Sequence, residues 1–131
     1  MTCKSPMKIL VIDDDQPVLR VLVKVLVTYG YGVDTAETGA EGIQIIESDK
    51  FDLVLTDIKM PGMSGTEVTN KISQIKGNRL PVIGMTDTPW LSKNTLFDEV
   101  LIKPFSIKEL IKVIQKYCPA PAKTETKKEL Q

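Results

Sequence analysis

Six polar side chains follow short apolar segments that have the composition of buried β-strands. Each stands where its segment ends: Asp13, Asp14, Asp15, Asp57, Thr86 and Lys103. The carboxyl ends of parallel strands lie along one edge of a sheet, and ligands of such sheets bind outside that edge. We therefore expect these side chains to lie close together although they are far apart in the chain.

Asp13, Asp14 and Asp57 would bring about three negative charges within a few ångströms, and such charges cannot all stay ionised without compensation. The Lys103 ammonium offsets one of them, and a divalent cation would offset the other two. The sequence contains no His, and ligands that are oxygens alone favour Mg²⁺ among the common ions. Mg²⁺, carboxylates, an ammonium and a hydroxyl are the groups that phosphoryl transfer uses. One of these carboxylates is therefore a candidate phosphoryl acceptor.

Five β-rich segments alternate with helical segments along the chain. The expected strands are residues 8–12, 33–36, 51–56, 81–85 and 99–102. The expected helices are residues 16–29, 39–48, 64 or 66–76, 89–94 and 106–117, of which the fourth is short. This alternation predicts an α/β fold with a parallel sheet, because crossovers of this length join parallel strands. With a strand order of 2-1-3-4-5, the first and third strands would be neighbours at the point where the order reverses.

Capping signals support several of these helix boundaries. Ser64 and Ser106 are each followed three residues later by a glutamate, Glu67 and Glu109, which is the spacing of a capping box. Asp15 is expected to be a loop acid or the N-cap of the first helix. Gly30 is suited to end that helix.

Length and composition exclude several classes of protein. The chain has 131 residues, enough for one domain, and 17 basic residues balance 17 acidic ones. We therefore expect no direct binding of nucleic acid or an anionic membrane. The first apolar run is too short for a signal sequence or a membrane span, which predicts a cytoplasmic protein. Cys3 and Cys118 are expected to be reduced thiols.

Five signature positions occur in one order on the expected strand ends: Asp13-Asp14, Asp57, Met60-Pro61-Gly62, Thr86 and Lys103-Pro104. With this pattern, residues 8–117 resemble the receiver domain of two-component response regulators. The resemblance implies a flavodoxin-like, doubly wound sheet of order 2-1-3-4-5 with helices on both faces. Residues 1–118 would form the receiver domain, and residues 119–131 are expected to be a disordered tail.

The resemblance also implies roles for the residues of the site. Asp57 would be the phosphoacceptor and, with Asp14 and the backbone carbonyl of Lys59, a direct ligand of Mg²⁺. Asp13 would act on the metal mainly through water.

Two groups would hold the phosphoryl oxygens, namely the Thr86 hydroxyl and the Lys103 ammonium. The resemblance further implies a cis peptide bond between Lys103 and Pro104.

The same resemblance implies a phosphoryl donor and a mode of output. The donor would be a phosphohistidine on a sensor histidine kinase or phosphotransfer protein, and the signal would pass on by protein contact. Slow hydrolysis of the aspartyl phosphate would make the chain a weak autophosphatase and not a metabolic enzyme.

Three features depart from the family pattern. Val100 stands where the family generally has an aromatic residue that switches rotamer with the threonine, and Phe97 or Trp90 are candidates to replace that ring.

The other two departures lie between Thr86 and Lys103. This interval is shorter than usual by about five residues, roughly one and a half helical turns, which predicts a shortened fourth helix. Asp87 stands where a small residue usually follows the threonine, and its charge would oppose phosphate unless it faces solvent.

Two alternatives remain open from the sequence. One is a degenerate receiver that serves as a constitutive docking module and is never phosphorylated. The other is a small phosphatase of the haloacid dehalogenase type. Asp13-x-Asp15 imitates the paired aspartates of that family, although Pro17 stands where its motif has Thr or Val.

Overall fold

A single parallel sheet forms the centre of the molecule. The computed structural model describes residues 7–88 and 97–119, and its sheet has the strand order β2-β1-β3-β4-β5. The strands are β1 (Lys8–Ile12), β2 (Gly32–Ala36), β3 (Leu53–Asp57), β4 (Val82–Thr86) and β5 (Glu99–Ile102). The predicted fold class and strand order are both confirmed.

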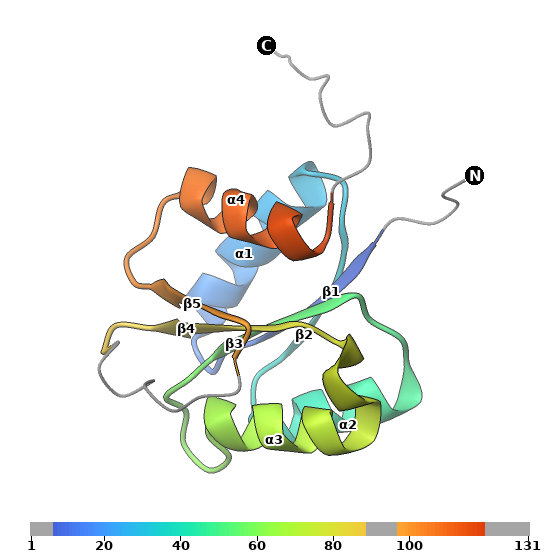
Figure 1. The fold of residues 1–131 in the computed structure, drawn as a ribbon. Coiled ribbons are helices and arrows are strands. Elements are labelled where there is room, and N and C mark those ends of the chain that lie inside the picture. Colours follow the sequence, from blue (N-terminus) through green and yellow to red (C-terminus); the bar gives the residue numbers. More distant parts are fainter. Residues whose placement is uncertain (1–6, 89–96, 120–131) are drawn as a thin grey trace, which may run out of the picture.

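Helices lie on both faces of this sheet (Figure 1). They are α1 (Gln16–Thr28), α2 (Gly39–Ser48), α3 (Gly65–Lys76) and α4 (Ile107–Tyr117), with a 3-10 turn at Gly77–Arg79. α4 corresponds to the fifth helix expected from the sequence. The expected helix at residues 89–94, and with it Trp90, lies outside the described residues, as does the expected tail from residue 120 onward.

Alternate residues of the strands enter two separate apolar cores. Ile9 and Val11 of β1 face α1 and α4, and Leu10 and Ile12 face α2 and α3. All four side chains are fully buried. Burial on both faces explains why β1 is a continuous apolar run and not an alternating one.

Two strands extend further at their carboxyl ends than the sequence predicted. β3 and β4 were expected to end at residues 56 and 85, but Asp57 and Thr86 are their last residues. Backbone hydrogen bonds between neighbouring strands continue past the apolar residues, as the Ile58 amide donates to the Met85 carbonyl at 2.9 Å. The polar side chains of the site are therefore held by the sheet itself.

The predicted helix caps are confirmed. Ser64 and Ser106 each form a complete capping box with the glutamate three residues on. The Asp15 side chain accepts a hydrogen bond from the Val18 amide. Gly30 has a φ of 95°, and the hydrogen bonds of residues 30 and 31 to the Val27 and Leu26 carbonyls close a Schellman motif.

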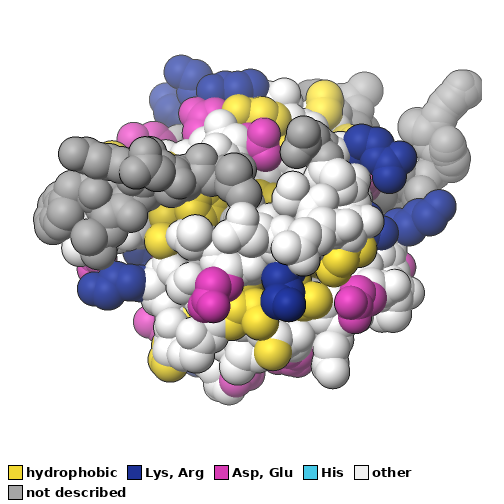
Figure 2. Space-filling model, turned by 60° about the horizontal axis from the view of Figure 1, so that its bottom comes forward, with side chains coloured by type: hydrophobic (Ala, Val, Ile, Leu, Met, Phe, Trp, Pro, Cys, Tyr) yellow, Lys and Arg dark blue, Asp and Glu magenta, His cyan; other side chains and the backbone are white. Residues whose placement is uncertain are grey.

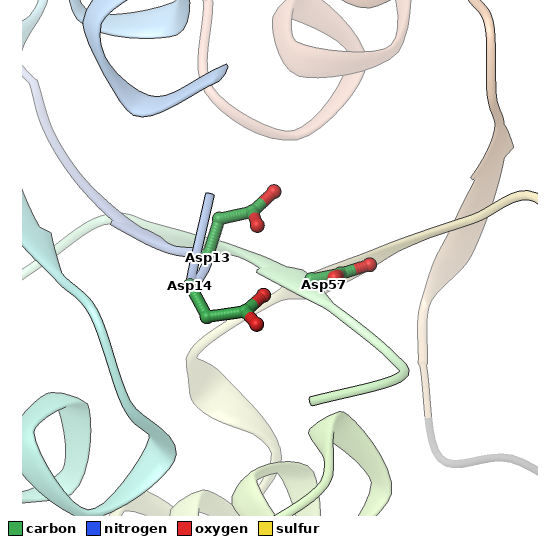
Figure 3. Close-up of side chains that lie close together, drawn as sticks. All are labelled: Asp13, Asp14 and Asp57. Atoms are coloured by element: carbon green, nitrogen blue, oxygen red, sulfur yellow. The ribbon is translucent and has the colours of Figure 1, made fainter. Parts of the chain in front are cut away.

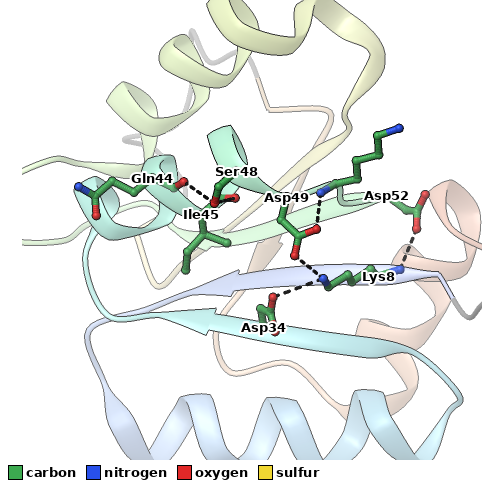
Figure 4. Close-up of polar contacts among 8 residues, drawn as sticks. Lys8, Asp34, Gln44, Ile45, Ser48, Asp49 and Asp52 are labelled. Atoms are coloured by element: carbon green, nitrogen blue, oxygen red, sulfur yellow. Dashed lines mark hydrogen bonds and ion pairs between the residues drawn. The ribbon is translucent and has the colours of Figure 1, made fainter.

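A lysine joins several elements at the amino-terminal edge of the sheet (Figure 4). The Lys8 ammonium lies 2.5 Å from a carboxylate oxygen of Asp49 and 3.6 Å from one of Asp34. Its backbone amide donates to Asp52 at 2.7 Å, and its ammonium lies 5.0 Å from the centre of the Phe51 ring. These contacts connect β1 with β2 and with the segment between α2 and β3.

Charges of both signs are interspersed among apolar and neutral side chains on the face shown in Figure 2. Within the described part of the chain, every helix is too short or too polar to cross a membrane.

Replacing Gly65 by alanine is expected to lower the free energy of unfolding by about 1–3 kcal/mol, because a Cβ there overlaps the backbone of β3. That atom would meet the Asp57 carbonyl oxygen and lie 2.7 Å from the Ile58 Cα. Gly32→Ala is the matched control, since its Cβ would have its nearest neighbour at 3.8 Å. Urea denaturation measures both variants, and equal stabilities would contradict the close approach.

Candidate active site

Three carboxylates meet at the carboxyl edge of the sheet (Figure 3). Asp13 and Asp14 follow β1 and Asp57 ends β3, and these two strands are paired side by side. One oxygen from each carboxylate lies within 4.8 Å of the others. The structure thus brings together the three acids that the sequence singled out, across 42 intervening residues between Asp14 and Asp57.

The Lys103 ammonium reaches the same place from the residue that follows β5, a strand two positions from β3 in the sheet. Its Nζ lies 3.4 Å from Asp57 Oδ1 and 3.5 Å from Asp13 Oδ2. The Lys103 backbone amide donates to the Thr86 carbonyl at 2.8 Å, which aligns the ends of β4 and β5. The peptide bond from Lys103 to Pro104 is cis, as expected.

Burial governs the ionisation of this cluster. Asp13 is fully buried and Asp57 is 8% exposed. The pKa of Asp57 is raised to about 6, chiefly by burial and further by Asp13 and Asp14, against the lowering effect of Lys103. Burial raises the pKa of Asp13 as well, against the opposing effect of Lys103. Burial lowers the pKa of Lys103, but Asp57 and Asp13 outweigh this and raise it overall.

The donor set fits a hard divalent cation. Asp13 Oδ1 accepts a hydrogen bond from the Asp15 amide at 3.0 Å, whereas Asp13 Oδ2 is a buried oxygen with no hydrogen-bond donor among the described residues. The Lys103 ammonium lies 3.5 Å from this oxygen but also faces Asp57, so it compensates the buried charge of Asp13 only in part. With three carboxylates and one ammonium the site has an excess of two negative charges. These residues therefore suit Mg²⁺, which prefers oxygen ligands.

Thr86 lies at the same edge, as the last residue of β4. It is 2% exposed, and its hydroxyl oxygen accepts a hydrogen bond from the Thr88 amide at 3.0 Å. The hydroxyls of Thr86 and Thr88 are 3.1 Å apart. The sequence analysis placed Thr86 at this edge but did not identify Thr88 as its partner. The only sequence signal for that contact is a second threonine two residues after the first.

The remaining residues singled out from the sequence lie around this cluster. Lys59 lies in the loop that follows Asp57, with its side chain exposed. That loop is anchored by Gly65, whose amide donates to the Ile58 carbonyl at 2.8 Å. Asp15 caps α1, so it is not a member of the acid cluster. Asp87 is exposed and lies along a pocket beside Lys103.

Phe97 packs beside Gly84, the residue of β4 that pairs with Val100, where the family pattern has an aromatic residue. Val100 pairs with Gly84 on β4, and a Cβ on Gly84 would lie 3.1 Å from the Phe97 Cδ1 and 2.8 Å from the Ile58 Cδ1. The absent side chain of Gly84 thus leaves the space into which Phe97 packs. Phe97 precedes β5 and stands three residues before Val100 in the chain.

The sequence of residues 9–115 matches the family described as the response regulator receiver domain. Response regulator MprA of Mycolicibacterium vanbaalenii is 35% identical over 111 residues, which are 81% of this chain and 48% of that protein. The chain therefore spans about half the length of the curated relatives of this kind that it matches.

Solved structures resemble the fold closely. Response regulator TrrA of Thermotoga maritima, in complex with Mg²⁺ and BeF, has a TM-score of 0.79 and 35% identity, covering 85% of this chain and 98% of that one. A CheY-like receiver domain protein of Methanospirillum hungatei has a TM-score of 0.78 and 32% identity, covering 86% and 93%. Both neighbours are similar over nearly their whole length.

The raised pKa of Asp57 predicts a pH-dependent cost of burying its charge. In metal-free buffer, Asp57→Asn should raise the free energy of unfolding by about 3 kcal/mol above pH 7, because the pKa of Asp57 rises from 3.8 to about 6 and one pKa unit corresponds to about 1.4 kcal/mol. The folded wild type takes up a proton near pH 6, whereas the unfolded chain does so near the ordinary value of 3.8, so wild-type stability recovers as pH falls between these values. The advantage of the variant should vanish below about pH 4.

Urea denaturation at a series of pH values in EDTA measures this difference. Asp34→Asn, which changes a carboxylate on β2 whose side chain is 45% exposed, is the matched control. A difference in unfolding free energy between Asp57→Asn and the wild type that does not change with pH would contradict the raised pKa of Asp57.

Proposed function

Because the chain belongs to the response regulator receiver domain family, we propose that it is a phosphoacceptor switch in signal transduction, with Asp57 as the residue that accepts the phosphoryl group. The observation that carries this proposal is the contact of Asp57 with both Lys103 and the acid cluster at the end of β3. The donor would be the phosphohistidine of a sensor histidine kinase or phosphotransfer protein.

Asp57 is suited to be the nucleophile. One of its carboxylate oxygens attacks phosphorus, the bond from phosphorus to the histidine nitrogen breaks, and the nitrogen leaves with the bonding electrons. The product is an aspartyl phosphate. Asp13 and Asp14, with the Lys59 backbone carbonyl, would complete a Mg²⁺ site with Asp57, and the bound ion would supply neutralisation of charge on the transferred group.

Lys103 and Thr86 would bind the transferred group. The Lys103 ammonium lies 3.4 Å from Asp57 and so stands beside the position of the incoming phosphoryl oxygens. The Thr86 hydroxyl would donate a hydrogen bond to another of these oxygens. Positioning and charge neutralisation of this kind account for most of catalysis in phosphoryl transfer.

The phosphodonor protein would dock beside Lys103. An open, mostly apolar pocket of about 600 Å³ lies between α1 and the segment that follows β5. Its lining residues are Pro17, Val18, Val21, Leu22, Asp87, Lys103, Pro104 and Phe105. A protein surface seated there would bring a phosphohistidine to the edge on which Asp57 lies.

The two alternatives receive less support. A phosphatase of the haloacid dehalogenase type would need Asp15 at the reacting group, whereas Asp15 caps α1. A docking module that is never phosphorylated would have no need of the ion pairs that Lys103 forms with the buried carboxylates of Asp13 and Asp57. We further propose that the protein acts in the cytoplasm and passes its signal on by protein contact, with slow hydrolysis resetting the switch.

Asp57→Asn is expected to abolish labelling by acetyl phosphate in the presence of Mg²⁺, because the amide cannot act as the nucleophile. Intact-protein mass spectrometry measures the added phosphoryl group. Asp34→Asn should be labelled like the wild type, and labelling of Asp57→Asn at the wild-type rate would refute the assignment. Wild type that binds Mg²⁺ but is never labelled would instead indicate the docking module.

Lys103→Met is expected to act in opposite directions on two measurements. Removing the ammonium leaves Asp13 and Asp57 without their cation, so Mg²⁺ should bind more tightly. Labelling by acetyl phosphate should nevertheless slow by roughly 10²–10³-fold, as when one donor to a developing oxyanion is removed. Titration calorimetry and labelling kinetics measure the two effects, and weaker Mg²⁺ binding would contradict the electrostatic account.

A further inference from the structure

The Thr86 hydroxyl is already engaged in this structure. Among the described residues its polar partners both belong to Thr88, whose amide lies at 3.0 Å and whose hydroxyl oxygen lies at 3.1 Å. The amide can only donate, so it occupies one acceptor position of the Thr86 oxygen. In the contact between the two hydroxyls, either oxygen can be the donor.

A threonine hydroxyl has a single proton to give. A phosphoryl group on Asp57 offers only acceptor oxygens, so Thr86 can bind it only with that proton. Thr86 is 2% exposed, and a buried hydroxyl left without partners is costly. Any contact that already uses the proton of Thr86 therefore competes with the phosphoryl group.

We propose that Thr88 is a positioning residue that holds Thr86 in the unphosphorylated state, by accepting the proton of the Thr86 hydroxyl. The inference rests on the proposed function of Asp57. Phosphorylation breaks this contact, the Thr86 proton turns to a phosphoryl oxygen, and the half-buried Thr88 hydroxyl is left to bond with water. The strength of the contact between the two threonines thus sets how readily the switch responds.

Neighbouring contacts explain why the hydroxyl can move while the backbone stays in place. The Lys103 amide donates to the Thr86 carbonyl, which fixes the end of β4 against β5. Asp87, between the two threonines, is exposed. The turn from Thr86 to Thr88 is therefore held by the sheet on one side and by the two threonine contacts on the other.

Thr88→Val is the direct test, because valine keeps the shape and the backbone amide and removes only the hydroxyl. With Mg²⁺ present, the variant should bind beryllofluoride, a mimic of the phosphoryl group, roughly three- to tenfold more tightly than the wild type, as expected for one lost competing hydrogen bond. Thr88→Ser restores the hydroxyl and should bind like the wild type. Mg²⁺ affinity without beryllofluoride should be unchanged in both variants, since the contact does not involve the acid cluster.

A double-mutant cycle separates positioning from a general structural effect. In a Thr86→Val background, Thr88→Val should leave beryllofluoride affinity unchanged, because the proton for which the two partners compete is gone. Equal affinity of wild type and Thr88→Val, or the same change in both backgrounds, would overturn the inference. Weaker binding by Thr88→Val would also overturn it, as it would show that Thr88 itself binds the phosphoryl group.

A second measurement does not depend on phosphoryl chemistry. The exchange of the Thr86 hydroxyl proton with water, measured by NMR in the metal-free protein, reports whether that proton is held in a hydrogen bond. Slower exchange in the wild type and Thr88→Ser than in Thr88→Val is the expected result, and equal exchange rates would overturn the inference. A wild type that shows this pattern but binds no beryllofluoride would refute the proposed function while leaving the contact itself established.

Discussion

The contact of the Lys103 ammonium with the carboxylates of Asp13 and Asp57 is the interaction on which the rest of the site depends. It brings together the ends of β1, β3 and β5, and it exists only because these strands are parallel and β3 lies next to β1. The ammonium offsets one of three clustered negative charges; burial keeps those of Asp13 and Asp57 poorly screened, whereas Asp14 is exposed. This imbalance makes the site suited to a divalent cation and to the transfer of a negatively charged group.

The backbone determines how closely these groups approach. Hydrogen bonds carry β3 and β4 past their apolar residues, so Asp57 and Thr86 are strand residues with fixed directions and not members of loops. Gly65 lets the start of α3 come against the Asp57 carbonyl, and Gly84 leaves room for Phe97 beside β4. A side chain at either glycine would displace backbone or a packed ring close to Asp57. The site is therefore rigid where the acids lie, and it can adjust at the hydroxyls of Thr86 and Thr88.

Most of this architecture could be predicted from the sequence, because strand ends and capping boxes have strong local signals. The convergence of Asp13, Asp57 and Lys103 followed from the rule that parallel strands place their carboxyl ends at one edge. Strand ends were wrong by one residue at Asp57 and Thr86, since side-chain polarity does not reveal where a backbone ladder stops. The contact between Thr86 and Thr88 and the place of Phe97 beside Gly84 depend on rotamers and packing, for which a single sequence carries little signal.

Lys8 and Lys103 show how the same residue types differ at the two edges of one sheet. Lys8 lies beside Asp34 and Asp49, whose side chains are nearly half exposed, and its hydrogen bond lowers the pKa of Asp49. Lys103 meets carboxylates that are buried, and there burial wins and the pKa of Asp57 rises. Dissolved ions screen exposed pairs far more than buried ones. A rise in ionic strength should therefore weaken the ion pairs of Lys8 at the amino-terminal edge of the sheet. The ion pairs of Lys103 at the opposite edge should be weakened much less.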